Sequence, residues 1–363
     1  MEPDSKPFTP VSTLGEFGLI GHLTNSLHLL QPSSVKGVGD DAAVIRYKGN
    51  PYTVATTDML LEGIHFDLTY TPLKHLGYKA AMVNFSDIYA MNARPRQLLI
   101  SLGISGRFGV EQLEELYAGL HMACTRHGVD LVGGDTNSSL TGLTISITVL
   151  GEATKKQLTY RNTAREGDLI CVSGDLGAAY LGLQVLEREK KLFEQDASFQ
   201  PDLSSYEYII GRFLKPEARK DIIDYLERAG ITPHAMIDLS DGLSSDLMHV
   251  CEQSQLGCKI FNHKIPIEER TAQTAEEFGL EPLIPALNGG EDYELLFTVG
   301  TDAYEKIIHF PEISIIGHMV EPEAGRYLVT QEGTAIELKA QGWNHSAPMR
   351  TSLPAQEDGR QKK

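Results

Sequence analysis

The spacing of apolar positions along the first part of the chain predicts an alternation of strands and helices. In residues 71–93 apolar side chains recur every three or four positions, which is typical of a helix. Residues 96–105 and 143–151 instead alternate apolar and polar positions, the period of a half-buried strand. We also expect a strand at 52–58, a helix at about 110–127 and a short strand that runs into residues 132–139.

The second part of the chain contains the same kinds of segment. Short apolar runs predict strands at 168–174, at 235–240, near residue 258 and within 288–300. The helices expected between them cover residues 177–189, 215–230, 242–257 and the later part of 258–279. Residues 190–207 are polar and lack a clear period, so we expect an exposed excursion and assign it no role.

These segments together predict an α/β (α+β) fold with two domains whose sheets have antiparallel character. The expected parts are a flexible N-terminus (1–12), an N-terminal domain with a mixed sheet and helices (13–152), a C-terminal α/β domain (153–345) and a disordered tail (346–363). The chain of 363 residues is long enough for two domains of ordinary size.

Composition narrows the class of protein. Apolar residues make up 41 % of the chain, enough to build proper cores, and no run reaches the ~20 apolar residues that span a bilayer. The N-terminal residues MEPDSKPFTP lack the features of a signal peptide, so we expect a cytoplasmic protein. The four cysteines form no CxxC pair, which favours buried thiols over a zinc site or disulfides.

The charge of the chain bears on its partners. The chain has 32 basic and 49 acidic residues, a net charge of −17, which argues against a nucleic-acid or anionic-membrane surface. Such a field also repels phosphate substrates. Bound divalent cations would reverse its sign locally, so a phosphate-handling site in this chain would need them.

Acidic residues recur in turns at the ends of the expected elements. A single Gly-Asp turn is ordinary, but strand ends meet at one edge of an α/β sheet, where ligands usually bind. The motifs are GVGDDAAV (37–44), TTDMLLEGIHF (56–66), NFSDIYAMNARP (84–95), VGGDTNSS (132–139), VSGDLG (172–177), IDLSDG (237–242) and NGGEDYEL (288–295).

The segment IDLSDGLSSDL (237–247) shows the two interpretations of such a turn. Asp238 and Asp241 lie three residues apart and repel each other unless something positive lies between them. The structural alternative is a strand-to-helix turn in which one Asp or Ser240 caps the helix. The number of similar turns elsewhere favours a shared ligand.

The chemistry that these residues suggest is a polyphosphate held by metal ions. Carboxylates and Thr hydroxyls are hard oxygen ligands of the kind that suits Mg²⁺. The sequence has no G-x-x-x-x-G-K-[ST], no G-x-G-x-x-G that opens a helix after a strand, and no protein-kinase motif set. No residue stands out as a covalent nucleophile, so direct in-line transfer is the simplest hypothesis for a phosphoryl transfer.

The ordered set GDDAAV, TTDMLLEGIHF, NFSDIYAMNARP, GGDT, IDLSDG and GGEDYELLFT resembles thiamine-monophosphate kinase, a family of the PurM-like superfamily. The resemblance extends from about residue 15 to 345. It implies a homodimer that pairs through N-terminal sheets, ATP as co-substrate, several Mg²⁺ ions and phosphorylation of thiamine monophosphate to thiamine diphosphate.

The resemblance also implies roles for individual residues. Those implied for Mg²⁺ are Asp41, Thr56, Thr57, Asp58, Asp87, Asp135, Asp238 and Asp241. Those implied for ATP are Gly134, Asp135, Arg161 and Ser240. Those implied for thiamine monophosphate are His65, Glu291 and Trp343. The family's Tyr before GGDT has no certain counterpart, and Tyr117 lies only near its place.

Several alternatives stay open at the level of sequence. Asp87 could face solvent, His65 could be a structural histidine, Arg161 an ordinary surface arginine and Trp343 a core residue. Asp40 and Asp175 are left out of the expected site: Asp40 is either a turn residue or a support for the ligand residues, and VSGDLG is interpreted as a structural turn near the nucleotide. Two other functions compete with the kinase: an ATP-dependent synthetase of the same superfamily that activates an amide or formyl oxygen, and a non-catalytic sensor of nucleotide or metal.

Overall fold

The computed structural model describes residues 18, 31–47, 51–196 and 200–339. Their strands form two sheets, one from residues 34–153 and one from residues 169–337. This arrangement confirms the expected α/β class, while the proposed domain boundaries stay a prediction. In the described parts of the chain no helix is long and apolar enough to cross a membrane.

The first sheet has six strands in the order β1-β2-β3-β6-β4-β5. All neighbours run antiparallel except β4 and β5, which are parallel. The bounds are β1 Ser34–Lys36, β2 Ala43–Ile45, β3 Tyr52–Leu61, β4 Arg94–Ile104, β5 Asp130–Ser138 and β6 Leu143–Ala153.

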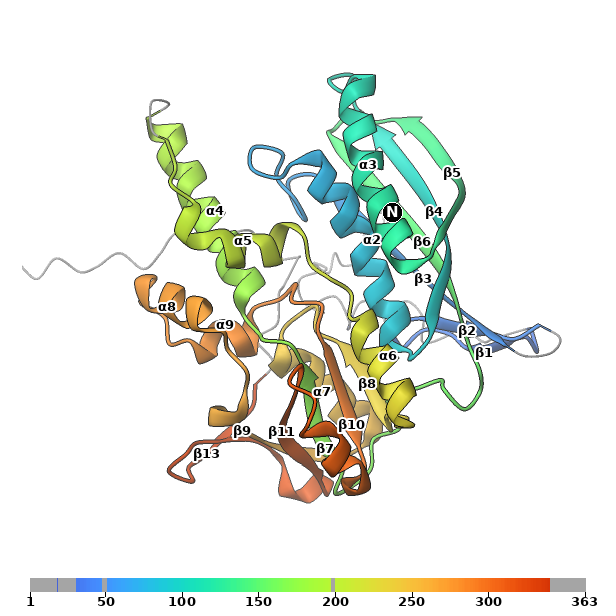
Figure 1. The fold of residues 1–363 in the computed structure, drawn as a ribbon, viewed down its shortest axis with the longest axis vertical. Coiled ribbons are helices and arrows are strands. Elements are labelled where there is room, and N and C mark those ends of the chain that lie inside the picture. The colour runs from blue at the N-terminus through green and yellow to red at the C-terminus, as the bar shows by residue number, and fades with distance from the viewer. Residues whose placement is uncertain (1–17, 19–30, 48–50, 197–199, 340–363) are drawn as a thin grey trace, which may run out of the picture. The chain divides into compact units, whose positions relative to one another are not determined.

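Helices α2 (Leu73–Ala90) and α3 (Val110–His127) cover one face of this sheet (Figure 1). The two helices approach each other closely because each has a glycine at the contact. A Cβ at Gly77 would meet the carbonyl oxygen of Leu116 at 1.9 Å, and one at Gly119 would meet that of Lys74 at 1.8 Å. The glycines therefore set the position of α2, which carries part of the site.

The second sheet has seven strands in the order β13-β12-β9-β11-β7-β10-β8, and all are antiparallel except the pair β9 and β12. The strand bounds are β7 Leu169–Ser173, β8 Ala235–Asp238, β9 Gly257–Phe261, β10 Leu295–Val299, β11 Ile313–Val320, β12 Arg326–Val329 and β13 Ala335–Glu337. Strands β7 and β10 inside the sheet and β8 at its edge are almost wholly buried, which explains their continuous apolar sequence.

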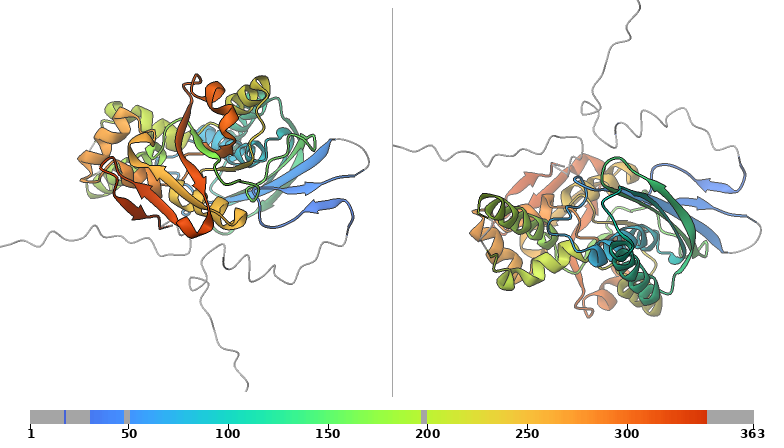
Figure 2. Two further views of the ribbon diagram at one scale, coloured as in Figure 1. Left: turned by 90° about the horizontal axis from the view of Figure 1, so that it is seen from below. Right: turned by 90° about the horizontal axis from the view of Figure 1, so that it is seen from above.

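Helices α4 to α10 connect the strands of the second sheet from β7 to β11 (Figures 1 and 2). Their bounds are α4 Ala178–Gln195, α5 Glu207–Leu214, α6 Lys220–Ala229, α7 Leu243–Ser254, α8 Glu269–Glu277, α9 Leu283–Asn288 and α10 Tyr304–Ile307. Short 3-10 turns are η2 Ser204–Tyr206, η3 Asn262–Lys264, η4 Thr301–Ala303 and η5 Pro322–Ala324. Gly230, in the left-handed region with φ 64°, ends α6 as the sequence predicts.

The expected excursion at 190–207 is wrong in part. Helix α4 continues to Gln195, and α5 begins at Glu207. The last turns of α4 project Leu192 and Phe193 toward solvent, so their sequence has no buried face that would mark a helix. The expected tail at 346–363 and the flexible N-terminus lie outside the described residues.

Most of the other predicted strands and helices are confirmed, and some of them begin or end at other residues than predicted. The expected strands and helices of the first part are confirmed within a few residues, and all four cysteines are buried free thiols. The helix expected at 215–230 begins only at Lys220. The elements that were not expected are strands β1, β2, β11, β12 and β13 and helices α5, α9 and α10.

Candidate active site

Three carboxylates from distant parts of the sequence meet between the two sheets. Asp41 follows β1 in the GDDAAV turn, Asp87 lies on α2, and Asp238 ends β8. One carboxylate oxygen of each lies within 4.8 Å of the other two. We call Asp41, Asp87 and Asp238 the carboxylate cluster.

Hydrogen bonds from neighbouring elements hold the cluster in place. Thr56 Oγ1 of β3 donates to Asp87 Oδ2 at 2.5 Å, and Ser86 Oγ of α2 donates to Asp238 Oδ2 at 2.7 Å. Consecutive residues of α2 thus connect the first sheet to the second. The alternative that Asp87 faces solvent is wrong, because its carboxylate contacts β3 and the other acids.

Burial and the mutual repulsion of the carboxylates determine the electrostatics of the cluster. Burial raises the pKa of Asp87 well above its usual value, and the charges of Asp58, Asp238 and Asp41 raise it further. Burial and Asp41 raise the pKa of Asp238 to about 8. Burial also raises the pKa of Asp41, whose buried Oδ2 has no hydrogen-bond partner among the described residues.

Arg161 is the basic residue paired with this group. Its Nη2 lies 2.6 Å from Asp41 Oδ1, its Nε lies 3.6 Å from Asp40 Oδ1, and the residue is only 7 % exposed. Arg161 is therefore not an ordinary surface arginine. Asp40, which sequence reasoning left out, has a fully buried side chain, and burial followed by Asp41 raises its pKa to about 6.

These donors suit a divalent cation. A buried carboxylate oxygen without a partner, three carboxylates in mutual reach and a Thr hydroxyl form a hard-oxygen set of the kind that Mg²⁺ prefers. Among the described residues, Arg161 and Lys36 pair with the acids of the GDDAAV turn. A cation would relieve the mutual repulsion that, after burial, raises the pKa values of Asp87 and Asp238. Asp58, on the same face of β3 as Thr56, adds its charge to the group.

The IDLSDG turn brings Ser240 and Asp241 beside the cluster. The Asp241 N–H donates to Asp246 Oδ2 at 3.2 Å, and Asp246 lies in the first turn of α7 with 2 % exposure. Burial and then the charges of Asp241 and Asp238 raise the pKa of Asp246. Asp246 was missed from the sequence, although its place in the first turn of a helix after two acids could have indicated it.

Comparison with known proteins identifies the family. Residues 39–153 match the family model described as AIR synthase related protein, N-terminal domain. Thiamine-monophosphate kinase of Bacillus subtilis is 32 % identical over 92 % of this chain and 99 % of its own length. The enzyme of the same name from Aquifex aeolicus is 34 % identical over 92 % of this chain and 98 % of its own.

The chain belongs to the thiamine-monophosphate kinase family. A solved structure of AaThiL complexed with AMPPCP and TMP aligns with a TM-score of 0.79 at 32 % identity, over 94 % of this chain and all of the other. The fold is accordingly PurM-like, which confirms the resemblance found in the sequence.

Not every residue expected from the thiamine-monophosphate kinase pattern lies in the carboxylate cluster. Thr57 points to the other face of β3, where its hydroxyl donates to the Ile147 carbonyl at 3.0 Å and lies 3.0 Å from Thr148 Oγ1. Gly134 and Asp135 lie on the exposed edge strand β5. Asp135 Oδ2 accepts a hydrogen bond from Asn137 at 2.7 Å. Tyr117 lies on α3 and is 36 % exposed.

The three acids of the GGEDYEL segment have different partners. Glu291 pairs with Lys79 at 2.9 Å. Asp292 accepts the Gly177 N–H at 2.8 Å at the start of α4. Glu294 is shared by two arginines and Ser173. Of the three acids, only Glu291 keeps substantial exposure, since its side chain is 29 % exposed.

His65 lies in a loop that α4 holds in place. Its Nδ1 accepts the Leu61 N–H at 3.0 Å, so the proton of the neutral ring is assigned to Nε2. In the same loop, Asp67 pairs with Lys190 at 2.6 Å, and the Tyr70 hydroxyl donates to Glu187 at 2.7 Å. The segment expected as an excursion thus helps to position this loop. Trp343 lies outside the described residues.

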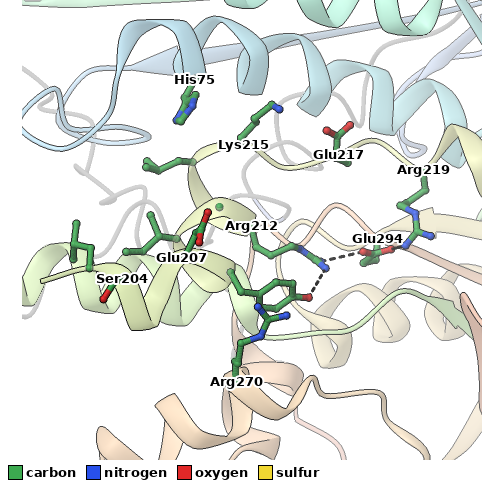
Figure 3. Close-up of a pocket in the computed structure, with 14 residues that line it drawn as sticks. His75, Ser204, Glu207, Arg212, Lys215, Glu217, Arg219, Arg270 and Glu294 are labelled. Carbon is green, nitrogen blue, oxygen red and sulfur yellow. Dashed lines mark hydrogen bonds and ion pairs between the residues drawn. The ribbon is translucent and has the colours of Figure 1, made fainter.

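A pocket of about 960 Å³ opens between the start of α2, helix α5 and Glu294, the residue directly before β10 (Figure 3). Its buried arginines are paired: Arg212 Nη2 lies 3.0 Å and Arg219 Nη1 2.5 Å from Glu294. Arg212 also pairs with Asp175 at 3.1 Å. None of the expected site residues that the structure describes lines this pocket.

Proposed function

We propose that this protein transfers the γ-phosphoryl group of ATP to the phosphate of thiamine monophosphate, which gives thiamine diphosphate and ADP. Membership of the thiamine-monophosphate kinase family over nearly the whole chain supports this reaction. The related structure that contains AMPPCP, a non-hydrolysable ATP analogue, and TMP supports the same pair of substrates. The observation that carries the proposal is the carboxylate cluster between the two sheets.

We propose that Asp41, Asp87 and Asp238 hold Mg²⁺, together with Asp58, Asp241 and the Thr56 hydroxyl. When bound, Mg²⁺ would neutralise phosphate charge that the protein, at −17, otherwise repels. Thr56 and Ser86 orient two of the carboxylates, and Arg161 holds Asp41. Thr57 contributes to this set only if its backbone does, since its hydroxyl is on the other face.

For ATP we propose contacts from Gly134, Asp135, Arg161 and Ser240. Arg161 pairs with Asp41 of the cluster, and Ser240 lies two residues after Asp238 in the IDLSDG turn, which supports a place near the transferring phosphate. Asp135 lies on β5, outside the carboxylate cluster, so its role as a metal or nucleotide ligand rests on the family pattern alone. For the acceptor we propose His65, Glu291 and Trp343.

The transfer itself is proposed to be direct. An oxygen of the acceptor phosphate attacks the γ-phosphorus, the bond from that phosphorus to the β–γ bridging oxygen breaks, and ADP leaves with the electron pair. The residues of this chain bind and orient the two substrates. The carboxylates would hold Mg²⁺ near the phosphates, and Arg161 adds a positive charge beside them. No phosphorylated side chain is part of this scheme.

The two alternative functions have less support. A synthetase that activates an amide or formyl oxygen shares the fold, but the relatives that match nearly the whole chain are thiamine-monophosphate kinases. A non-catalytic sensor would bind ATP without turnover. The acids of the family pattern are all present, and three of them meet in one cluster, which favours a working enzyme.

We further propose a homodimer that pairs through the first sheet. The face of this sheet opposite α2 and α3 exposes apolar side chains, among them Met59 at 54 % and Leu99 at 37 %. On the edge strand β5, Val132 is 56 % exposed. A second copy of the chain would cover these side chains. The cytoplasmic location and the lack of nucleic-acid and membrane partners remain predictions from the amino-acid sequence.

An assay with purified protein, Mg²⁺, ATP and thiamine monophosphate tests the function, with the products identified by mass. Thiamine diphosphate and ADP should appear in equal amounts. Excess chelator should stop the reaction and added Mg²⁺ restore it. Full activity in excess chelator would contradict the metal-assisted scheme, and ATP binding without product would favour the sensor.

A further inference from the structure

Lys79 is a buried lysine that the proposed reaction does not yet use. It lies on α2, about two helical turns before Asp87. Only 2 % of the residue is exposed. Lysine is seldom buried to this degree without a partner. The partner of Lys79 is Glu291, whose Oε2 lies 2.9 Å from its Nζ.

The two members of this pair differ in their access to solvent. The side chain of Lys79 is 3 % exposed and that of Glu291 is 29 % exposed. Phe213 of α5 closes the inner side, since the ammonium lies 4.0 Å from the centre of its ring. The buried cation therefore holds one oxygen of a carboxylate that still reaches the solvent.

The backbone of Glu291 is fixed as well. Its φ is 65°, in the left-handed region that non-glycine residues seldom adopt. Its N–H donates to the Ser240 carbonyl at 2.8 Å, and the Tyr293 N–H donates to the Leu239 carbonyl at 2.9 Å. The segment therefore lies directly on the IDLSDG turn, next to the residues proposed to handle phosphate. Because the backbone of Glu291 is fixed, the position of its carboxylate depends only on its side-chain torsion angles.

We propose that Lys79 is a positioning residue of the acceptor site, which orients Glu291 by holding Oε2. The other carboxylate oxygen then accepts a hydrogen bond from an amine on the heterocycle of the acceptor. Thiamine monophosphate offers such a donor in the amino group of its pyrimidine ring. This inference rests on the proposed acceptor role of Glu291.

A direct role for Lys79 makes different predictions. A lysine that bound the transferring or accepting phosphate would stabilise charge in the transition state, and its loss would lower kcat. A lysine that acts through Glu291 affects the binding of the acceptor ring, which raises KM for the acceptor. Its effect should also vanish once Glu291 can no longer pair with it.

The test is a double-mutant cycle with Lys79→Met, Glu291→Gln and the double variant. We expect each single substitution to raise KM for thiamine monophosphate about 10- to 100-fold, the range for a hydrogen bond to a charged group. The value of kcat and KM for ATP should stay within about twofold, because no phosphate contact is lost. The double variant should be no worse than either single variant.

Lys215→Met is the matched control. Lys215 also lies over an aromatic ring, with its Nζ 4.8 Å from the centre of Tyr78, and it lines the pocket of Figure 3 rather than the proposed site. Its loss should leave all three kinetic constants near those of the wild type. Lys79→Arg, which keeps a cation, should recover most of the acceptor affinity.

Four results would overturn the inference. Additive effects of the two substitutions, or a fall in kcat for Lys79→Met at unchanged KM, would show that Lys79 does not act through Glu291. If Glu291→Gln raises KM for thiamine monophosphate but Lys79→Met does not, Lys79 does not act through Glu291, and the acceptor role of Glu291 is still supported. An unchanged KM for Glu291→Gln would refute both. If melting curves show that Lys79→Met does not fold, Lys79→Gln takes its place in the cycle.

Discussion

Asp238 is the residue whose charge we expect to respond most directly to ligand binding. Its carboxylate is buried beside Asp41, with Ser86 as its hydrogen-bond donor. We expect Asp238→Asn to leave the metal-free protein as stable as the wild type or more so, because a neutral amide avoids the cost of burying this acid beside Asp41. The variant should lose most of the rise in Tm that Mg-ATP gives by binding the native state.

Melting curves with and without Mg-ATP measure both effects. Ser86→Ala, which removes the donor but keeps the carboxylate, is the control and should retain most of the ligand-induced shift. If Asp238→Asn destabilises the metal-free protein while the shift remains intact, Asp238 is only a turn residue.

The raised pKa of Asp238 also predicts a pH dependence. The pKa is about 8 in the folded protein and 3.8 as its ordinary value, so the folded state holds a proton that the unfolded chain releases. The stabilisation from that proton is complete below pH 3.8 and is lost as pH rises through about 8. The Tm of the metal-free protein should therefore fall between pH 6 and pH 9, by roughly 2–4 °C for each kcal/mol lost.

The same titration should favour metal at high pH, because Mg²⁺ binds the deprotonated carboxylates. Calorimetry in buffers of different ionisation enthalpy would detect the proton release. A metal-free Tm that is flat from about pH 6 to 9, together with metal binding that releases no proton, would show that these acids are already ionised.

At the level of elements, the position of the site depends most on the contact between helices α2 and α3. Asp87, Ser86 and Lys79 all lie on α2, and Gly119 of α3 touches the Lys74 backbone. Gly119→Ala should destabilise the protein by about 1–3 kcal/mol through overpacking and lower its activity. Gly211→Ala, in helix α5 with open space around the new Cβ, should be neutral or stabilising by about 0.5–1 kcal/mol.

Denaturant unfolding of the two alanine variants measures this difference. Equal stability of both would mean that α2 and α3 can separate without cost, and that the glycines do not set the position of α2.

At the level of elements, the sequence predicts what local pattern determines and misses what tertiary contacts determine. The alternation of apolar and polar residues in β4 and β6 marks half-buried strands. The same two-residue period in β3 places Thr56 and Asp58 on one face of that strand and Thr57 on the other. From that period the sequence could have predicted that the Thr57 hydroxyl is not one of the metal ligands. The end of α4 has no buried face, so nothing local marked it as a helix.

The cluster itself could be predicted only in part. Acids at strand ends indicated Asp58 and Asp238, whereas the pairing of Arg161 with Asp41 and of Lys79 with Glu291 joins residues far apart in sequence. One sequence without an alignment carries no signal for such pairs. The family pattern supplied Asp41 and Arg161, and it supplied no role for Asp40, Asp246 or Lys79.

At the scale of the whole molecule, the exposed face of the first sheet predicts a homodimer. Light scattering at micromolar concentration should give twice the chain mass of 39.9 kDa. Met59→Lys should shift the protein toward the monomer, because a charge at the centre of an apolar contact is costly to bury. A monomer mass for the wild type would contradict the proposed pairing.

The position of bound metal tests the role of the carboxylate cluster most directly. A crystal of the protein grown with Mn²⁺ and a non-hydrolysable ATP analogue should show anomalous peaks within coordination distance of Asp41, Asp87 and Asp238. Metal bound elsewhere, with these three carboxylates left without an ion while the nucleotide is in place, would contradict the account of how this enzyme brings two phosphate substrates together.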